Sequence, residues 1–400
     1  MEYDYDCIVV GGGPAGLQFA REIVSNSDRS VVVLERNDDL RANDKSTGGT
    51  FEEVIDRYDI PEDVIMGAND TITFEGPTER SRLDISGYVL DFPRLLAFLG
   101  DDAAAKGAEI RLGTTVTKPI LESGTVHGVR YRDSDGEGKL RGKVTIDATG
   151  PNAVITSDLG FFDTETAQRG IGLEYEIEGE YETDDTMLFN FDHENAPGGY
   201  AWTFPAGDDV FKAGVCWVDE YHARHGNGTP IHEAVERWVN DDPRWHVERI
   251  RAKHAGKGVW NDSRNQRATD GFMAVGDSIS SINPLFGEGI RPGMASATMA
   301  ATVATVALRA DDVSETRLRQ YDRRWNETRG GRWRLQRILS DLLYDFDTRQ
   351  QDSFVRRAGR LSATKAERLR QYDLGMLDLA KLYPFALKDV SKVPKLLRRL

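Results

Sequence analysis

Three glycines near the start of the chain, Gly11, Gly13 and Gly16, form a GxGxxG pattern that can hold phosphate groups. In such a turn the first glycine permits a tight bend, the second lets a pyrophosphate approach the backbone, and the third lets a helix pack closely on a strand. The helix N-terminus offers free N–H groups and a positive partial charge to the phosphates. Glu35 follows about 20 residues on, where a carboxylate binds ribose hydroxyls. These residues predict a site for an adenine dinucleotide.

The residues around these glycines predict the strand, turn and helix that the motif requires. Residues 7–10 form a short apolar run typical of a buried parallel strand, and residues 17–24 have the apolar spacing of a helix. A second apolar run, residues 31–34, ends directly before Glu35. A glycine loop that binds nothing is the alternative, but this order of elements favours the dinucleotide.

Two later stretches indicate which dinucleotide this is. Residues 144–150, VTIDATG, predict a strand that ends in small residues, and residues 271–277, GFMAVGD, predict another that ends in Gly-Asp. The sequence NPLFGEGI follows at residues 283–290. This order resembles the glutathione-reductase-type FAD fold, in its p-hydroxybenzoate-hydroxylase-like branch.

The resemblance implies that FAD is the cofactor. It places Asp277 at the ribityl chain and the backbone N–H groups of Gly287, Gly289 and Ile290 along the pyrimidine edge of the flavin. A helix that begins there would stabilise the negative charge of a reduced flavin near N1. The cofactor-binding residues expected on this basis are Gly11, Gly13, Pro14, Ala15, Gly16, Glu35, Arg36, Gly276, Asp277, Gly287, Gly289 and Ile290.

Residues 197–205, PGGYAWTFP, alternate aromatic side chains at a period of two, as on one face of a strand. The pattern alone leaves two interpretations, a hairpin that packs its rings into a core or a wall of rings that faces an apolar ligand. The stretch resembles the YxWxFP motif of the geranylgeranyl reductase family, in which it lines the prenyl-chain cavity. The resemblance extends over the whole chain and implies that the substrate-binding residues are Pro197, Tyr200, Trp202, Phe204 and Pro205.

The family resemblance implies an FAD-dependent reductase, of the haloarchaeal type, that hydrogenates isolated C=C bonds of geranylgeranyl chains in ether phospholipids or prenyl diphosphates. A dry channel of aromatic and aliphatic groups suits such a hydrocarbon. The flavin supplies a hydride, and the alkene also needs a proton, for which Tyr200 is a candidate by residue type. Ser46 is a second catalytic candidate, because it stands where relatives often carry a cysteine. Phe92 stands where many relatives carry an arginine.

Three classes of function remain open at this point. A related reductase would act on the isoprenoid side chain of a quinone, and an FAD-dependent monooxygenase or halogenase would use the same fold. A flavin-binding or lipid-binding protein without catalysis is the third class. No second GxGxxG unit for a nicotinamide cofactor is found in the sequence, so either NAD(P)H or a ferredoxin is the expected electron donor.

The composition indicates a cytoplasmic protein adapted to high salt. Acidic residues number 66 and basic residues 51, for a net charge of −15, and arginine carries most of the positive charge. Cys7 and Cys216 are the only cysteines, which is no disulfide framework and fits a reducing compartment. The acidic N-terminus is unlike a signal peptide. Residues 292–308, rich in small residues, predict a packed internal helix rather than a membrane span.

The C-terminal stretch, residues 313–400, is basic in an otherwise acidic chain. It predicts either a peripheral contact with anionic lipid or a carrier protein, or a solvated helical face. No nucleic-acid module is expected. His222, His225 and His232 lie close in sequence, but no acidic or cysteine pattern completes a metal site, so no metal is expected.

The expected fold class is α/β (α+β), with a Rossmann-like FAD domain, an antiparallel-sheet substrate domain and a helical C-terminal region. The FAD domain is expected to be discontinuous, from residues 1–150 and 265–310, with part of 50–95 joining the substrate domain. The substrate domain is expected at 151–264 and the helical region at 311–400. Within that region an amphipathic stripe is predicted at Leu335, Ile338, Leu339, Leu342, Leu343 and Phe346.

Overall fold

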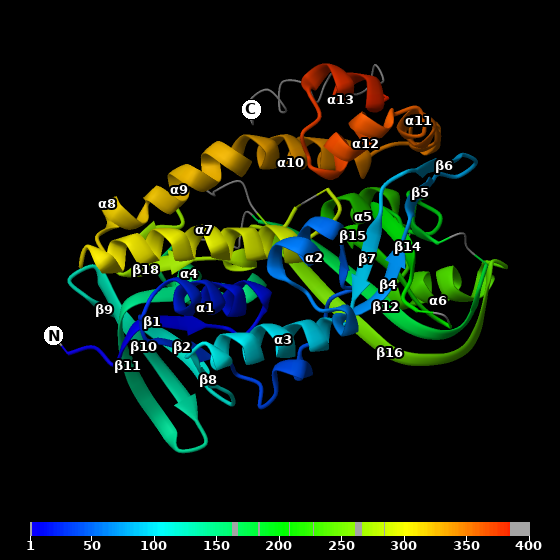
Figure 1. The fold of residues 1–400 in the computed structure, drawn as a ribbon. Helices are drawn as coiled ribbons and strands as arrows, with labels where there is room; N and C mark the ends of the chain where they lie inside the picture. Colours follow the sequence, from blue (N-terminus) through cyan, green and yellow to red (C-terminus); the bar gives the residue numbers. More distant parts are fainter. Residues whose placement is uncertain are drawn as a thin grey trace. The chain divides into compact units, whose positions relative to one another are not determined.

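The computed structural model describes residues 2–161, 167–182, 185–207, 209–226, 228–260, 266–283 and 285–384 (Figure 1). The chain divides into two compact units. The first contains Met1–Asp44, Phe92–Ala167 and Val259–Gly331, and the second contains Lys45–Asp91, Gln168–Gly258 and Arg332–Leu400. The division into FAD, substrate and helical regions drawn from the sequence stays a prediction.

The first unit is built on a mostly parallel sheet with the strand order β17-β18-β11-β1-β2-β8. Its centre is β1 (Tyr5–Val10), which runs parallel to β11 (Gly136–Asp147) and to β2 (Val31–Leu34). All four residues of β2 are buried and apolar, as expected for a strand inside a parallel sheet. The other strands are β8 (Glu109–Arg111), β17 (Ala268–Thr269), β18 (Phe272–Ala274), and the β9 (Thr115–Glu122) and β10 (Thr125–Asp133) pair that extends β11.

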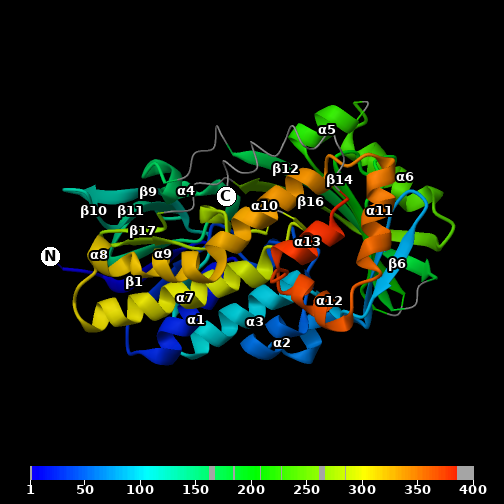
Figure 2. The same ribbon diagram turned by 90° about the horizontal axis from the view of Figure 1, so that it is seen from above.

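Three helices of the first unit lie side by side in Figures 1 and 2, namely α7 (Ile290–Arg309), α1 (Pro14–Asn26) and α3 (Phe92–Ala105). α1 begins with a proline, which is favoured there because its fixed φ suits a helix and its missing N–H would have no partner. α7 is the packed small-residue helix that the sequence predicts. In the described part of the chain, no helix combines the length and hydropathy of a membrane span.

Short elements complete the first unit. They are the helices α4 (Val154–Asp158), α8 (Glu315–Leu318) and α9 (Gln320–Trp325), the 3₁₀ turns η1 (Leu40–Ala42), η3 (Gly150–Asn152) and η4 (Gly276–Ile279), and the π-helical turn η5 (Asn326–Gly330). A tight turn joins β10 to β11, where Asp133 pairs with Gly136.

The second unit is built on a seven-stranded sheet with the order β16-β12-β15-β14-β13-β5-β6. The sequence motif PGGYAWTFP supplies β14, which is antiparallel to both of its neighbours. The strands are β16 (Trp245–Trp260), β12 (Gln168–Tyr181), β15 (Val210–Val218), β14 (Gly199–Pro205), β13 (Thr186–Asn190), β5 (Thr71–Glu75) and β6 (Arg80–Leu83). The predicted antiparallel sheet is therefore present, with one parallel pair between β13 and β5.

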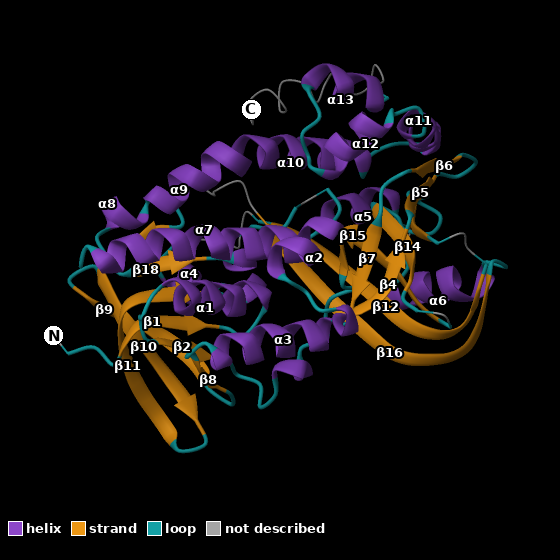
Figure 3. Cartoon of the chain, in the orientation of Figure 1, coloured by secondary structure: helices purple, strands orange, loops and turns teal. Residues whose placement is uncertain are grey.

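A small sheet and several helices accompany this large sheet (Figure 3). The small sheet contains β3 (Gly49–Thr50), β7 (Gly87–Leu90) and β4 (Ile65–Asn69), with the 3₁₀ turn η2 (Glu62–Val64) beside it in sequence. The helices are α2 (Glu52–Tyr58), α5 (Asp219–His225), α6 (Ile231–Asp241), α10 (Gly331–Leu343), α11 (Thr348–Ala358), α12 (Ala363–Arg370) and α13 (Met376–Leu382). Of the predicted stripe, Leu335 is half-buried and the other five residues are buried.

One face of the large sheet packs against α6. Ala201 of β14 and Val215 of β15 point to this face and share a buried cluster with Val235 and Trp238 of α6. The indole N–H of Trp238 also donates to the backbone carbonyl of Trp202, 2.9 Å away. The motif strand is therefore fixed from the α6 side, and its three aromatic side chains point to the opposite face.

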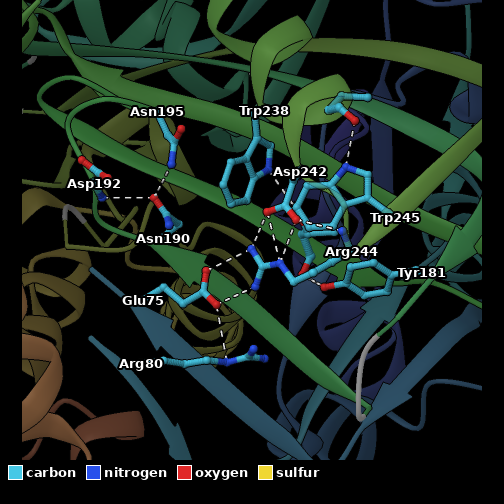
Figure 4. A network of polar contacts seen from close by, with 12 residues as sticks. Glu75, Arg80, Tyr181, Asn190, Asp192, Asn195, Trp238, Asp242, Arg244 and Trp245 are labelled. Atoms are coloured by element: carbon cyan, nitrogen blue, oxygen red, sulfur yellow. Dashed lines mark hydrogen bonds and ion pairs between the residues drawn. The ribbon is translucent and has the colours of Figure 1, made fainter. Parts of the chain in front are cut away.

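An arginine joins the edge of this sheet to the segment after α6 (Figure 4). The guanidinium of Arg244 lies between the carboxylates of Glu75 and Asp242, at 2.6 and 2.5 Å, and over the ring of Trp245. Arg80 approaches the same Glu75 carboxylate at 3.4 Å. Because Glu75 ends β5 and Asp242 follows α6, this ion-pair group ties two distant segments of the second unit together.

Candidate functional site

The glycine turn of the first unit has the geometry that a phosphate-binding motif needs. Gly11 has φ +108°, and a Cβ there would lie 2.5 Å from the carbonyl oxygen of Ala148. A Cβ at Gly16 would lie 2.1 Å from the carbonyl oxygen of Gly11, so helix and strand pack too closely for a side chain. A Cβ at Gly13 would meet nothing within 4 Å. The turn thus leaves space at the second glycine, where a pyrophosphate would approach.

Glu35 is attached to this turn by hydrogen bonds. Its Oε2 accepts the backbone N–H of Gly12 at 2.7 Å, and its Oε1 accepts the N–H of Asn37 at 2.9 Å. The carboxylate is therefore held beside the glycine turn at the end of β2. Arg36 is exposed next to it.

The second glycine-rich turn of the first unit meets the start of α1. Gly276 has φ +62°, and a Cβ there would lie 2.9 Å from the Cβ of Ala15. The Gly276 N–H donates to the hydroxyl of Ser296 in α7. The fold thus brings Gly276 next to the turn of residues 11–16, although the two are more than 250 positions apart in the sequence.

Asp277 follows in this turn and contains an unsatisfied acceptor. Its Oδ1 is buried and has no hydrogen-bond partner among the described residues. Burial raises the pKa of Asp277 to about 6. A Cβ at Gly289 would lie 3.7 Å from its Oδ2, so the start of α7 is close by. An orphaned carboxylate oxygen needs a donor, and a ribityl hydroxyl would supply one.

These observations fit a flavin dinucleotide. The first turn leaves room at Gly13, the helix α1 has no side chain capping its N-terminus, and Asp277 has a free acceptor. Ile290 begins α7, and Gly287 has φ +64°. Pro284, between these two turns in the sequence, lies outside the described residues.

Asp147, at the end of β11, is a site residue that the sequence reasoning missed. Its carboxylate accepts hydrogen bonds from the N–H and hydroxyl groups of Thr149 and of Thr156, and from the N–H of Ile155. Its backbone carbonyl accepts the hydroxyl of Ser278 at 2.7 Å. The signal was present as Asp-Ala-Thr at the end of the strand, but only the fold shows that this aspartate organises two turns.

In the second unit the motif rings form part of a continuous group, which we call the aromatic face: Phe74, Phe189, Tyr200, Trp202 and Phe204. Cross-strand register aligns them, because Trp202 pairs with Phe189 and Phe189 pairs with Phe74. The Phe189 ring lies 5.0 Å from that of Phe204 and 5.6 Å from that of Tyr200. Each motif ring is only 6–7% exposed. Pro197, by contrast, lies before β14, and Pro205 ends it.

Trp202 lies across two glycines and contacts a buried acid. A Cβ at Gly214 would lie 2.3 Å from Cζ2 of the indole, and a Cβ at Gly172 would lie 3.7 Å from Cη2. The indole N–H donates to Oε2 of Glu174 at 2.9 Å, and Glu174 is 3% exposed. The other carboxylate oxygen, Oε1, has no hydrogen-bond partner in the described part of the chain. Sequence reasoning missed Glu174, since it lies 28 residues before its partner.

Tyr200 is enclosed at the end of the aromatic face. Its ring stacks on Tyr344 at 6.4 Å, and it pairs with Cys216 in register. Burial raises the pKa of Tyr200 well above its ordinary value, with a further contribution from Cys216. A phenol in this state is a weak acid, which counts against the role in proton donation that its residue type suggested.

Ser46 belongs to a loop that packs on the aromatic face. Its hydroxyl accepts the N–H of Gly48, and the carbonyl of Thr47 accepts the ammonium group of Lys212 at 3.3 Å. A Cβ at Gly49 would lie 3.3 Å from the Phe204 ring. The fold therefore brings the loop of Ser46 and the YxWxFP strand together within the second unit.

Histidines hold the Pro-Gly-Gly turn before β14. His193 accepts the N–H of Gly198 at Nδ1 and contacts the carbonyl of Phe346 at Nε2, 2.8 Å away. His225 stacks on His193 at 4.0 Å, and His222 stacks on Trp217 at 3.9 Å. No set of three potential metal ligands gathers in the residues described.

Comparison with known proteins agrees with this geometry. Residues 6–388 match the family model described as lycopene cyclase protein. A digeranylgeranylglycerophospholipid reductase of Haloferax volcanii is 34% identical over 375 residues, which cover 90% of this chain and 91% of that protein. The match to the family model spans both glycine turns and the aromatic strand.

Two solved structures are similar in fold. A geranylgeranyl bacteriochlorophyll reductase-like protein of Thermoplasma acidophilum superimposes with a TM-score of 0.83 at 20% identity, over 98% of this chain and 99% of that one. A halogenase variant in complex with FAD gives a TM-score of 0.67 at 15% identity, over 92% and 82%. At these identities the likeness shows the fold alone. With a relative at 34% identity over 90% of its length and a family-model match over residues 6–388, the chain belongs to the geranylgeranyl reductase family.

Proposed function

We propose that the chain is an FAD-dependent reductase that hydrogenates isolated C=C bonds of geranylgeranyl chains in ether phospholipids or prenyl diphosphates. The observation that carries the proposal is the aromatic face. Its rings are aligned over three neighbouring strands, as a surface for a long hydrocarbon requires. The named function of the Haloferax volcanii relative supports the same substrate class.

FAD is proposed to bind to the two glycine turns of the first unit. Its pyrophosphate would accept N–H groups at the start of α1, beside Gly13, and its ribityl chain would donate to the free Oδ1 of Asp277. Glu35 would bind the ribose of the adenosine. When bound and reduced, the flavin supplies a hydride.

The residues of the second unit would position the substrate. The aromatic face excludes water from an apolar chain, and the Ser46 loop closes against it at Gly49. Of the two catalytic candidates, Ser46 remains a proposal, while the raised pKa of Tyr200 favours a packing role for that residue.

The proposed partners are a prenyl lipid and an electron donor, either NAD(P)H or a ferredoxin. A peripheral membrane contact through the basic C-terminal region is proposed as well, from a cytoplasmic location. The last part of that region, residues 385–400, lies outside the described residues.

The test is a mass spectrum of lipid after anaerobic incubation with chemically reduced, FAD-loaded protein in high salt, with an unsaturated geranylgeranyl ether lipid as the probe. The expected products are heavier by two hydrogens for each reduced bond. Unchanged mass with a shifted retention time would indicate a cyclisation instead. A product heavier by one oxygen, formed only under air with NAD(P)H, would indicate the monooxygenase. Lipid that is unchanged in both conditions contradicts the proposal.

A further inference from the structure

We propose that Glu174 donates the proton that completes the saturation of each C=C bond. The inference rests on the proposed function, because an isolated alkene has no carbonyl to stabilise added charge. Hydride addition at one carbon therefore needs proton delivery at the other. On the aromatic side of the sheet lies a buried acid, Glu174, of which one carboxylate oxygen accepts a hydrogen bond and the other has no partner among the described residues.

The register of three strands places Glu174 on the same side of the sheet as the motif rings. Glu174 of β12 pairs with Gly214 of β15, and Gly214 pairs with Trp202 of β14. Residues paired in this way share a face. Since Gly214 has no side chain, the Trp202 ring extends over it and its N–H reaches Oε2 of Glu174. The acid thus lies directly beside the central ring of the motif.

The other oxygen of Glu174 indicates a role beyond packing. Oε1 is buried without a hydrogen-bond partner among the described residues, and Glu174 has no ion pair there. Leaving a buried carboxylate oxygen without a hydrogen-bond partner costs stability, because the oxygen loses its contacts with water and gains none in the protein. A side chain needed only to orient Trp202 would use Oε2 alone, and a neutral amide would do this without a charge. The free oxygen is the one that can carry a transferable proton.

The uncharged polar neighbours on this face are weaker acids. Burial raises the pKa of Tyr200 well above its ordinary value and raises the pKa of the Cys216 thiol to about 12. Neither group readily gives a proton to an alkene, which is itself a weak base.

The charged neighbours already have partners. Lys212 donates to the carbonyl of Thr47 and pairs with Glu176 at 3.8 Å. Glu176 also lies 3.7 Å from Arg251. These contacts engage both side chains in ion pairs, whereas Glu174 is buried and keeps one carboxylate oxygen without a hydrogen-bond partner in the described part of the chain.

The proposed step balances as follows. The O–H bond at Oε1 of Glu174 breaks, and its proton forms a C–H bond at one alkene carbon. A reduced flavin, when bound, would supply the hydride and its two electrons for the C–H bond at the other carbon, and the C=C π bond would be lost. Water then returns a proton to the Glu174 carboxylate.

The experiment compares Glu174→Gln with Glu176→Gln in the FAD-loaded protein. Gln at 174 keeps an oxygen that accepts the Trp202 N–H but removes the acid, while Gln at 176 removes a carboxylate from the same strand and face. We expect Glu174→Gln to saturate the geranylgeranyl lipid about 100-fold more slowly than wild type, or worse. Glu176→Gln should stay within a few-fold. Flavin content and anaerobic flavin reduction should match wild type in both.

Binding to the oxidised protein gives a readout that does not depend on turnover. The probe is a prenyl analogue with an ammonium nitrogen in place of a substituted alkene carbon, compared with a neutral chain of the same length. Wild type should prefer the cation about tenfold, because the Glu174 carboxyl group can release its proton to solvent and pair, as a carboxylate, with the ammonium nitrogen. Glu174→Gln should lose that preference and Glu174→Asp, which keeps the acid, should retain it.

The outcomes separate the two proposals. Wild-type protein that reduces its flavin but leaves the lipid unsaturated contradicts the proposed function. Active wild type beside a Glu174→Gln variant of equal rate contradicts the role of Glu174. An equal loss in Glu176→Gln, or a cation preference that survives in Glu174→Gln, also overturns it. If Glu174→Gln does not retain flavin, the binding preference of Glu174→Asp decides, and its absence counts against the proposal.

Discussion

The two units build their candidate sites in different ways. In the first unit the site consists of backbone, because glycines at positions 11, 13, 16 and 276 let two turns approach each other and leave open space beside Gly13. In the second unit it consists of side chains, because register brings Glu174, Trp202 and Phe189 together from three strands.

The difference explains which parts could be read from the sequence. Each glycine turn is formed by neighbouring residues, so its pattern is contiguous, and the elements β1, α1 and β2 around GxGxxG were predicted correctly. A cross-strand site depends on pairings that are fixed only when the sheet forms. The motif rings could be read because they alternate within one strand, whereas Glu174 and Asp147 could not.

The largest expected effect is on the glycine turn. Gly16→Val places a side chain against the backbone oxygen of Gly11. Because this contact is with backbone, no side chain can move aside to relieve it. We expect loss of about 3 kcal/mol or more in the free energy of unfolding, with loss of flavin. Gly13→Ala is the matched control, since open space surrounds its Cβ. It should unfold like wild type without flavin yet bind FAD about tenfold more weakly. Equal stability of the Gly16→Val and Gly13→Ala variants would contradict the conclusion that helix and strand pack too closely at Gly16 for a side chain.

A second pair of variants tests how closely the Trp202 ring packs on the glycines beneath it. Gly214→Ala brings a Cβ to 2.3 Å from the indole, whereas Gly172→Ala stays at 3.7 Å from the same ring. Overpacking predicts a cost of about 1–3 kcal/mol for the first and less than about 0.5 kcal/mol for the second. Thermal unfolding of both variants measures the difference. Similar costs at the two glycines would mean that the ring is not fixed across Gly214.

The next effect concerns the ion-pair group of Figure 4. Arg244→Met leaves the carboxylates of Glu75 and Asp242 without their shared cation, and we expect a loss of about 1–2 kcal/mol by denaturant titration. Arg249→Met is the control, because Arg249 pairs with Glu178 at the surface and should matter little. If both variants unfold alike, Arg244 does not tie the two segments together.

The smallest effect at neutral pH is expected at His193. Burial lowers the pKa of His193 to about 4, from an ordinary value near 6.5. Between these values the unfolded chain binds a proton that the folded protein excludes. His193 therefore costs the protein stability progressively as the pH falls from about 6.5 to 4. His193→Gln should flatten the fall in melting temperature over this window and leave stability at pH 7–8 little changed. An unchanged slope contradicts the assignment.

Some expectations depend on properties that no fold displays. The requirement for high salt was inferred from the excess of acidic over basic residues, and it stays a prediction. The electron donor and the membrane contact of the basic C-terminal region also stay predictions, because both concern binding partners. In contrast, the buried Cys7 and the packed helix α7 are local properties of apolar segments, and the structure confirms both.

The most direct measurement of the central claim is to locate the prenyl chain on the protein. A geranylgeranyl ether lipid with a photoreactive diazirine on its chain would be cross-linked to the FAD-loaded protein, and the labelled peptides would be sequenced by mass spectrometry. The account predicts labels on β14 and on the loop of Ser46, and their loss when unlabelled lipid competes. Competable labels confined to other segments, such as α6 on the opposite side of the sheet, would contradict it.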